Sequence, residues 1–397
     1  MKKNVKKKAI LLVLDSAGIG ALPDAALYGD QGANTLGRIA EAMPSLELPY
    51  LNGLGLHFLV PQFVQRKKAV LKNPCYVGRM AECSNGKDTI TGHWELMGIL
   101  TEEPSPTFPN GFPEPLLEQI AERTGVTFLG NEVASGTEII QRLGATHVQT
   151  GKPILYTSAD SVLQIAAHED ILPVPQLYRL CAAIREITSS GPYKVGRVIA
   201  RPFIGQEGAY QRTTNRHDFA LPVPSPNLLE SLLQQKKQVL SVGKIGDIFS
   251  GIHFTQAVHT SDNGDGMEQT SKLYQQLDEG LLFVNLVDFD MKYGHRRDIW
   301  GYGHALASFD EALGQLLTEI DDETIVIITA DHGCDPGYQG TDHTREYVPL
   351  LIYGKGIRAN QCIAERNSFA DLAATLAQYF SVVYAAAGNS FAEEVFL

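Results

Sequence analysis

The sequence lacks the cysteine pattern of a disulfide-stabilised or thiolate-zinc protein. Its five cysteines are an odd number, lie far apart and never occur as CxxC. A disulfide framework and a structural zinc site held by thiolates are therefore both disfavoured, and the pattern fits a reducing compartment such as the cytoplasm. Most of these cysteines are expected to be small buried hydrophobes, although Cys334 lies two residues after His332.

Long hydrophobic runs and an excess of positive charge are also missing. No segment reaches the length of a membrane span, and the short run at residues 10–14 ends at Asp15, unlike a signal peptide. The 33 Lys and Arg residues are outnumbered by 45 Asp and Glu residues, and this balance argues against nucleic acid as the main partner. We therefore expect no membrane partner, no nucleic acid partner and no obligatory protein partner. The only basic run is predicted to be a frayed, solvated terminus, and it consists of Lys2, Lys3, Lys6, Lys7 and Lys8.

The length of 397 residues predicts more than one domain, because a single hydrophobic core seldom covers such a chain. Two proline-rich passages, at residues 104–115 and 222–226, divide the sequence. Aliphatic runs typical of parallel strands lie before the first passage and after the second. We expect residues 1–103 and 222–397 to form one α/β core, with residues 104–221 as an inserted α+β cap domain.

Within the predicted cap domain, four segments have a recognisable periodicity. Residues 153–156 and 195–200 are typical of strands, and residues 115–124 and 175–187 are typical of helices. The segment therefore has enough regular structure to fold as a domain of its own.

Three nearly continuous aliphatic runs end on an aspartate. They span residues 9–15, 281–290 and 324–331, and the pattern is typical of parallel strands covered on both faces. In open α/β sheets the ligand crevice lies beyond the carboxyl ends of the strands. Three carboxylates gathered there repel one another unless cations bind them. The pattern therefore predicts a metal site at the strand ends.

Histidines complete this predicted metal site. The candidate ligands are three carboxylates and three imidazoles: Asp15, Asp290, Asp331, His295, His332 and His343. Six such ligands suit two divalent ions with open positions better than one closed structural site. Mixed carboxylate and imidazole ligation is compatible with manganese or zinc. Gly294 is expected to permit the turn before His295. The alternative is that these are ordinary polar loop residues.

A polar loop at residues 84–95, SNGKDTITGHWE, is the second chemical element. Thr89 and Thr91 are candidate nucleophiles, because a hydroxyl coordinated to a dication loses its proton more readily. Lys87 could offset the charge of an incoming phosphate. The two glycines of this segment, Gly86 and Gly92, indicate an ordered loop with exposed backbone amides. An alternative interpretation is a turn leading into a helix capped by Thr91.

The sequence resembles a known family, the bacterial phosphopentomutases. The similar segments are GKDTITGHWELMG, YTSADSVLQIAAHE, GRVIARPF, NRHDFALP, NLVDFDMKYGHRRD, ITADHG and GTDHTREYVPLL. This family belongs to the alkaline phosphatase superfamily, as do the cofactor-independent phosphoglycerate mutases. ITADHG indicates only the superfamily, whereas the cap segments and the threonine loop are more specific. The resemblance implies an alkaline phosphatase-like core, with a mostly parallel sheet flanked by helices, and interconversion of (2-deoxy)ribose 1-phosphate and 5-phosphate.

The resemblance also implies roles for individual residues. Thr89 matches the threonine that carries the phosphoryl group, and its oxygen would be held by two divalent metal ions, with manganese expected. One metal would be bound by Asp290, His295 and His343, and the other by Asp15, Asp331 and His332. The substrate would be bound by Ser158, Asp160, Arg197, Arg201, Arg212, Lys244 and Lys87. The implied reaction passes through a phosphothreonine and a sugar 1,5-bisphosphate, which also serves as the activator.

Three other activities remain as alternatives. A metal-dependent phosphatase would share the metals and the nucleophile, but it needs no second cationic pocket, so the arginines favour a mutase. A phosphoglycerate mutase would be expected to use a serine nucleophile. A non-catalytic metal or phosphosugar binder would not need Thr89. One departure from the family pattern lies near the metals: Cys334 stands where asparagine is expected.

Overall fold

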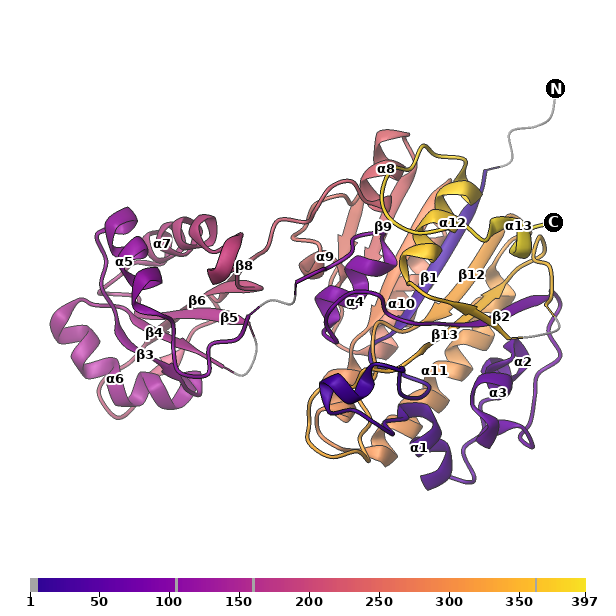
Figure 1. The fold of residues 1–397 in the computed structure, drawn as a ribbon, viewed down its shortest axis with the longest axis horizontal. Helices are drawn as coiled ribbons and strands as arrows, with labels where there is room; N and C mark the ends of the chain where they lie inside the picture. The colour runs from indigo at the N-terminus through magenta and orange to yellow at the C-terminus, as the bar shows by residue number, and fades with distance from the viewer. Residues whose placement is uncertain (1–5, 104–105, 159–160, 361–362) are drawn as a thin grey trace. The chain divides into compact units, whose positions relative to one another are not determined.

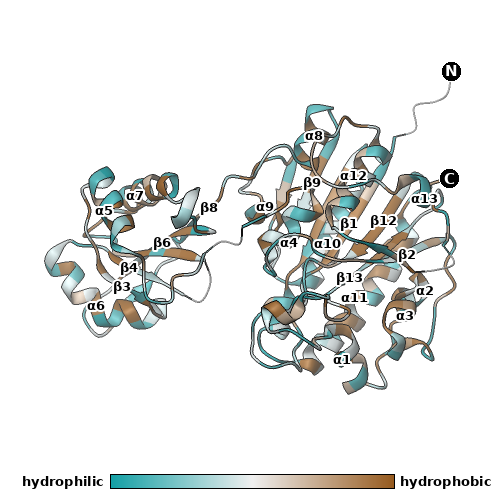
Figure 2. Cartoon of the chain, in the orientation of Figure 1, coloured by the Kyte–Doolittle hydropathy of each residue, from teal (hydrophilic) through white to brown (hydrophobic). Residues whose placement is uncertain are grey.

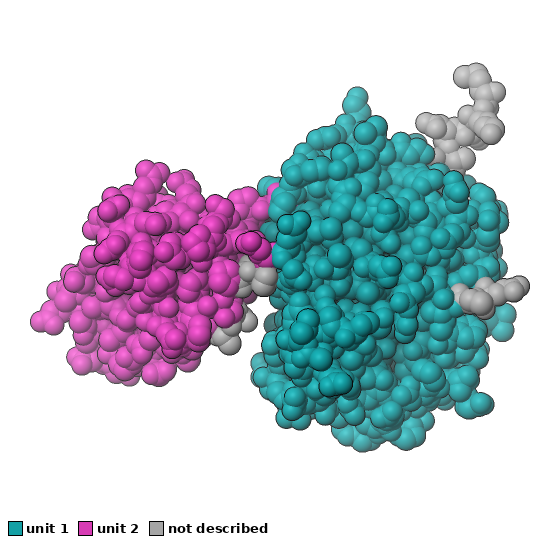
Figure 3. Space-filling view, viewed as in Figure 1, with its two compact units in different colours: residues 1–102, 224–397 teal, residues 103–223 magenta. Residues whose placement is uncertain are grey.

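The chain folds into two compact units. The computed structural model describes residues 6–103, 106–158, 161–360 and 363–397. The core domain comprises Met1–Glu102 and Pro224–Leu397, and the inserted domain comprises Glu103–Val223 (Figure 3). The inserted segment begins one residue earlier and ends two residues later than the predicted 104–221. The backbone N–H of Leu228 donates to Met97 O at 2.9 Å, so the chain leaves and re-enters the core domain at neighbouring points.

The core domain is built on one large sheet. Among the described residues its strand order is β10-β9-β11-β1-β12-β13-β2-β14 (Figure 1). Neighbouring strands are parallel, except that β13 is antiparallel to β12 and to β2. The strands are β1 (Lys8–Leu14), β2 (Cys75–Met80), β9 (Gln238–Val242), β10 (Gln256–Val258), β11 (Gly280–Leu286), β12 (Thr324–Thr329), β13 (Val348–Tyr353) and β14 (Ala364–Arg366).

The central strands owe their position to uninterrupted aliphatic sequence. β11 and β12 are buried along their whole length, and β1 is buried from its second residue onward. The hydrophobic character of β1 and β12 is visible as brown ribbon in Figure 2. In register, Ile10 of β1 faces Leu282 on one side and Val326 on the other. Since these three strands are parallel, their carboxyl ends meet at one edge of the sheet.

Helices cover both faces of this sheet. α1, α2, α10 and α11 pack together as one group, and α4, α8, α9 and α12 pack together as another (Figure 1). The helices are α1 (Thr35–Ala42), α2 (Pro49–Leu54), α3 (Leu56–Leu59), α4 (Thr89–Leu96), α8 (Leu228–Gln234), α9 (Ile245–Ile248), α10 (Asn263–Tyr274), α11 (Ile299–Glu319), α12 (Ala370–Phe380) and α13 (Ala392–Val395). Shorter helical turns are η1 (Ala25–Tyr28), η2 (Pro61–Phe63) and η4 (Phe289–Gly294). Within the described residues, no helix is both long and apolar enough to cross a membrane.

The inserted domain has its own mixed sheet and its own core. The described strands run in the order β3-β4-β5-β6-β7, with β8 pairing β6. They are β3 (Leu129–Val133), β4 (Ile154–Thr157), β5 (Val162–His168), β6 (Arg197–Ile204), β7 (Gln211–Arg212) and β8 (His217–Ala220). The helices are α5 (Glu114–Thr124), α6 (Gly136–Thr150), α7 (Val174–Ile187) and the turn η3 (Gly191–Tyr193). The predicted fold class, an α/β core with an inserted α+β domain, is confirmed.

Sequence periodicity missed some elements of the inserted domain. α6 was not predicted, because its glycines and threonines have low helix propensity. Its stability comes from packing instead: Ile139 and Ile140 are buried in a cluster with Tyr156 and Phe203. β6 begins two residues later than predicted and continues four residues further.

The basic N-terminal run is partly tied to the core domain. Lys8 begins β1 and its ammonium pairs with Asp321 at 2.8 Å. Lys7 Nζ donates to Tyr379 O at 2.6 Å, and Lys6 pairs with Asp278. The prediction of a frayed, solvated terminus is therefore wrong for Lys7 and Lys8, whereas Lys6 is solvent-exposed and Lys2 and Lys3 lie outside the described residues.

Candidate metal centre

The three aspartates converge at the carboxyl edge of the core sheet. Asp15 directly follows β1, and Asp331 lies two residues after β12. Asp290 departs from the prediction: β11 ends at Leu286, and Asp290 lies in the helical turn η4. The aliphatic run continues past the strand end, so periodicity alone did not locate this boundary. All three carboxylates are buried, with residue exposures of 0% to 4%.

The three histidines meet these carboxylates. His332 Nε2 lies 3.2 Å from Asp331 Oδ2 and 3.5 Å from Asp15 Oδ1. Asp290 lies between two imidazoles, with Oδ2 at 3.2 Å from His295 Nε2 and Oδ1 at 3.4 Å from His343 Nε2. The structure thus brings together all six residues predicted as metal ligands: Asp15, Asp290, Asp331, His295, His332 and His343.

Backbone carbonyls orient two of the imidazoles. His295 Nδ1 lies 2.6 Å from Thr341 O, and His332 Nδ1 lies 3.0 Å from Gly333 O. A carbonyl oxygen only accepts, so each Nδ1 carries the proton and donates it. Each Nε2 is therefore the ring atom directed toward the carboxylates, in the orientation a metal-binding histidine requires.

Several buried ligand atoms have no hydrogen-bond partner. They are Asp15 Oδ1, Asp290 Oδ1, Asp331 Oδ2 and His343 Nε2. Burying such atoms unpaired is costly, and coordination of a cation removes the cost. Ligand atoms of Asp15, Asp331 and His332 lie within 4.8 Å of one another, and so do those of Asp290, His332 and His343. The cluster therefore fits divalent cations, whereas their number and the assignment of each ligand to one ion stay predictions.

The electrostatics of the cluster favour cation binding. Burial and the charges of Asp331 and Asp290 raise the pKa of Asp15 to about 7. Burial also opposes ionisation of Asp331, but the charge of His332 outweighs it and the pKa of Asp331 falls well below its ordinary value. In return, although burial opposes it, Asp331 raises the pKa of His332 well above the usual range. A divalent cation would take the place of the protons that this cluster otherwise holds.

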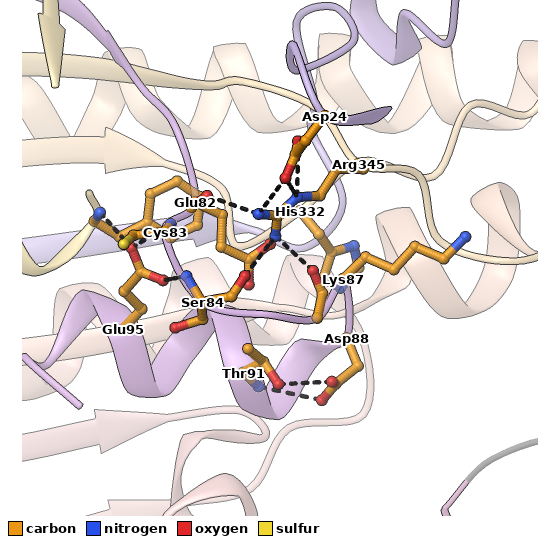
Figure 4. A network of polar contacts seen from close by, with 12 residues as sticks. Asp24, Glu82, Cys83, Ser84, Lys87, Asp88, Thr91, Glu95, His332 and Arg345 are labelled. Carbon is orange, nitrogen blue, oxygen red and sulfur yellow. Dashed lines mark hydrogen bonds and ion pairs between the residues drawn. The ribbon is translucent and has the colours of Figure 1, made fainter. Parts of the chain in front are cut away.

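Helix α4 carries Thr89 to this cluster. Thr89 is the first residue of α4, and its Oγ1 lies 3.2 Å from His332 Nε2. The helix is capped by Asp88, which accepts from the N–H of Ile90 and Thr91, so the alternative cap at Thr91 is wrong. Thr91 Oγ1 donates to Asp88 Oδ2 at 2.6 Å (Figure 4). This leaves Thr89 as the hydroxyl facing the metal ligands.

A glycine allows this helix to approach so closely. Gly92 lies within α4, not in an exposed loop as predicted. A Cβ atom added at Gly92 would lie 2.1 Å from Asp331 O. Any larger residue would therefore push α4, and with it Thr89, away from the metal ligands.

Two further residues at the centre were missed from the sequence. His93, one helical turn after Thr89, places Nδ1 at 2.9 Å from Thr89 O and 3.1 Å from Asp331 Oδ2. Asn285 Nδ2 lies 3.2 Å from His93 Nε2 and donates to Asp15 Oδ2 at 2.8 Å. The i, i+4 spacing of Thr89 and His93 was the available signal for His93. Asn285 gave none, because its partners come from distant segments.

The two lysines predicted to bind substrate lie at different places in the core domain. Lys87 Nζ lies 3.1 Å from Asp30 and 3.3 Å from Asp342. Figure 4 shows Lys87 in the segment that leads to α4. Its charge is therefore already balanced by carboxylates. Lys244 caps α9 at the end of β9, and its positive charge acts on Asp15 against the effects of burial, Asp331 and Asp290.

The predicted substrate residues of the inserted domain lie on or next to its sheet. Arg197 and Arg201 lie on the same face of β6, because they are four residues apart in the strand. Arg212 lies on the neighbouring strand β7. Ser158 follows β4, and Asp160 lies outside the described residues. Arg201 and Arg212 lie close enough for the charge of Arg212 to act on Arg201, whereas a shared ligand for the three arginines stays a prediction.

These arginines differ in how far they are already neutralised. Arg197 pairs with Asp218 at 3.5 Å, whereas Arg201 Nε donates to the neutral Gln164 at 3.1 Å. Burial lowers the pKa of Arg201, and the charges of Arg216 and Arg212 add to the effect. Arg216 was not predicted from the sequence. This concentration of positive charge suits an anion.

We predict that Cys334→Asn leaves the metal content unchanged. Cys334 Sγ lies 4.0 Å from His295 Nδ1, which already donates to Thr341 O, so the thiol lies on the side of the ring away from Asp290. Ligand atoms of Asp290, His295 and Cys334 do fall within 4.8 Å of one another. Metal analysis of dialysed wild type and variant tests the prediction, and a marked loss of bound manganese would show that the thiol participates.

Gly294 has a different role from the one predicted. Its backbone is not among those with positive φ. A Cβ atom there would instead lie 2.9 Å from Cys334 Sγ, so glycine is required by close packing and not by the turn.

Comparison with known proteins identifies the family. The model of the Metalloenzyme superfamily matches residues 7–384, which together with the ligand cluster supports the use of divalent metal. The chain is 52% identical to a phosphopentomutase of Desulfitobacterium hafniense over 98% of this chain and 100% of that protein. It is 50% identical to a phosphopentomutase of Acetivibrio thermocellus over 97% of this chain and 98% of that protein. Among solved structures, the chain is similar to phosphoglycerate mutase of Leishmania mexicana, with 13% identity and a TM-score of 0.48. The match covers 97% of this chain and 97% of that one. The resemblance found in the sequence is confirmed, and the chain belongs to the phosphopentomutase family of the metalloenzyme superfamily.

Proposed function

We propose that this chain interconverts the 1-phosphate and 5-phosphate of ribose or 2-deoxyribose. The observation that carries the proposal is the position of Thr89, whose Oγ1 lies 3.2 Å from a buried histidine within a cluster of six metal-type ligands. This arrangement occurs in a chain that is about half identical, over nearly its full length, to proteins named phosphopentomutase.

Thr89 is the proposed carrier of the phosphoryl group. In the first half-reaction, the bond between phosphorus and Thr89 Oγ1 breaks as a bond to a sugar hydroxyl oxygen forms, and the sugar becomes the 1,5-bisphosphate. In the second half-reaction the other phosphoryl group returns to Thr89, which releases the isomeric monophosphate. The proton lost by the sugar hydroxyl in one half is regained in the other, so the enzyme is restored. A bisphosphate would also serve as the activator that first phosphorylates Thr89.

The six ligand residues are proposed to hold two Mn²⁺ ions. Asp290, His295 and His343 would bind one, and Asp15, Asp331 and His332 the other. Such ions neutralise charge on phosphoryl oxygens and lower the pKa of a bound hydroxyl. Asn285 would keep Asp15 in place through the hydrogen bond described above, and His93 would do the same for Asp331 through the electrostatic contact at 3.1 Å.

Recognition of the second phosphate is proposed to fall to basic residues. Arg201 and Arg212 are the strongest candidates, since Arg197 is already paired with Asp218. Arginine suits this role because its planar fork matches phosphate oxygens. Ser158 and Asp160 are proposed to bind the sugar, and Lys244 to bind a phosphate. For Lys87, the two neighbouring carboxylates weaken the original proposal.

A single assay separates the candidate activities. The purified protein is incubated with Mn²⁺, a trace of ribose 1,5-bisphosphate and ribose 1-phosphate, and in parallel with 3-phosphoglycerate in place of the pentose. Formation of ribose 5-phosphate supports the proposal. Release of inorganic phosphate would indicate a phosphatase, 2-phosphoglycerate a phosphoglycerate mutase, and no product at all a binding protein.

Pentose phosphates are the proposed small-molecule partners, and the cytoplasm is the proposed location. The scattered cysteines without CxxC pairs support a reducing compartment. The formal charge of -12 supports the absence of a nucleic acid partner.

A further inference from the structure

The segment that delivers Thr89 is held from two sides. It runs from Glu82 to Asp88, between β2 and α4. On one side, Glu95 of α4 accepts from the backbone N–H of Cys83 and Ser84 at 2.9 and 2.7 Å. On the other side lies a guanidinium group that donates hydrogen bonds to backbone carbonyls of the same segment. We call residues 82–88 the nucleophile loop.

That guanidinium belongs to Arg345, which is almost completely buried. Its Nη1 donates to Ser84 O at 2.8 Å and to Gly86 O at 2.6 Å. Its Nη2 donates to Glu82 O at 2.9 Å (Figure 4). Three carbonyl oxygens of the nucleophile loop therefore share one side chain, whose exposure is 2%.

Carboxylates balance the charge of Arg345. Nη1 lies 2.7 Å from Glu82 Oε2, and Nε and Nη2 lie 3.2 and 3.0 Å from Asp24 Oδ2. Glu82 is buried, and burial raises its pKa well above the ordinary value despite the opposing charge of Arg345. The ring of Tyr28 lies beneath the guanidinium, with its centroid at 4.9 Å. Asp24 and Tyr28 lie outside the nucleophile loop, so Arg345 is held by contacts that do not depend on that loop.

Arg345 also belongs to the segment that supplies a metal ligand. It lies two residues after His343, and its own N–H donates to Asp30 Oδ2 at 2.9 Å. The backbones of Thr344 and Gly333 exchange two hydrogen bonds, at 2.7 and 3.0 Å. One short segment, residues 343–345, therefore connects the metal ligands His343 and His332 to the loop that presents Thr89.

We propose that Arg345 is a positioning residue for the nucleophile: it fixes the nucleophile loop to the metal-ligand segment so that Thr89 Oγ1 stays in reach of the metal centre. The inference rests on the proposed role of Thr89 as phosphoryl carrier. Lysine cannot replace arginine here, because one ammonium cannot reach the carbonyls of Glu82, Ser84 and Gly86 and two carboxylates at once.

Arg345→Lys in the metal-loaded, full-length enzyme tests the proposal. We expect kcat to fall about 10²-fold with KM for ribose 1-phosphate unchanged, because a small displacement of the nucleophile affects chemistry and not binding. Amide hydrogen exchange should accelerate in residues 83–88, whereas the amides of β1 and β12 keep their protection. Manganese content should stay at the wild-type level.

Arg66→Lys is the matched control. Arg66 also lies in the core domain and donates to three backbone carbonyls, those of Ala40, Met43 and Leu46, but it holds the end of α1. This variant should lose thermal stability without losing kcat per folded molecule and without faster exchange in residues 83–88.

A double variant, Glu82→Gln with Arg345→Met, covers the case in which a single change leaves Glu82 unpaired and prevents folding. It removes both members of the buried pair together, which proteins tolerate better than removal of one. The same fall in kcat and the same local exchange are expected.

The proposal would be overturned by a wild-type kcat, or by unchanged exchange in residues 83–88, in Arg345→Lys or in the double variant. So would a fall in kcat for Arg66→Lys equal to that for Arg345→Lys. If the wild type itself converts no pentose phosphate, the proposed function fails, but the exchange measurement still decides whether Arg345 fixes the nucleophile loop.

Discussion

Replacing Thr89 by alanine is expected to lower pentose phosphate turnover by about 10⁴-fold or more, because it removes the hydroxyl that would carry the phosphoryl group. Thr91, the nearest alternative in the sequence, donates its hydroxyl to Oδ2 of Asp88, the residue that caps α4. The variant should still fold and bind metal, since Thr89 makes no backbone-capping bond with its side chain. The measurement is the rate of ribose 5-phosphate formation, together with the intact mass of protein incubated with ribose 1,5-bisphosphate.

Two other substitutions serve as controls for Thr89→Ala. Thr89→Ser keeps an oxygen at the same position and should retain measurable turnover and a phosphorylated mass. Thr91→Ala removes a hydroxyl two residues away, and it should weaken the start of α4 while leaving most of the activity. A Thr89→Ala enzyme with full turnover, or one still phosphorylated on the same peptide, would contradict the phosphothreonine mechanism.

The second large effect is expected from Asp15→Asn, and it has opposite signs in the metal-free and metal-loaded protein. Burial and the charges of Asp331 and Asp290 raise the pKa of Asp15 from 3.8 to about 7. Because the folded pKa lies above the unfolded value, the metal-free fold loses stability as pH rises through this window. Asparagine does not ionise, so the metal-free variant should be more stable than wild type at pH 7.

The metal-loaded variant should show the reverse. Asparagine is a weaker ligand than a carboxylate, so the stabilisation by metal, about 2.7 kcal/mol at a concentration of 100 Kd, should largely disappear. Turnover should fall about 10³-fold, since charge neutralisation by the bound ions supplies several kcal/mol. Thermal melting with and without Mn²⁺ at several pH values, combined with kinetics, measures both effects.

Asp310→Asn is a suitable control for this experiment. Asp310 is another buried aspartate, and burial raises its pKa to about 6 although it accepts from the N–H of Tyr50 and Leu51. It lies on α11 and is not one of the ligand residues. The metal-induced rise in melting temperature should be as large in this variant as in wild type. An Asp15→Asn protein that retains that rise would show that Asp15 is not a ligand.

The sequence located the centre because its pattern is local. An aliphatic strand followed by Asp is recognised within ten residues, and β1 and β12 were placed within two residues of their observed bounds. The start of α4 was misplaced because aspartate and threonine are both good helix caps, and only the structure shows that Asp88 makes the bonds.

The residues that hold the centre together had no local signal. Arg345 contacts Glu82 across 263 positions and Asp24 across 321. Asn285 contacts Asp15 across 270 positions. Such contacts depend on strand order and on the packing of α4 against the sheet, neither of which composition or periodicity specifies.

The adjacent exit and return of the chain have an evolutionary consequence. Since Met97 and Leu228 are hydrogen-bonded, and every strand of the core sheet comes from residues outside the insertion, the core fold closes without it. Lineages can therefore exchange or remodel the inserted segment while the transfer chemistry is inherited intact. A change in what the inserted domain binds would therefore not require a change in the residues of the metal-ligand cluster.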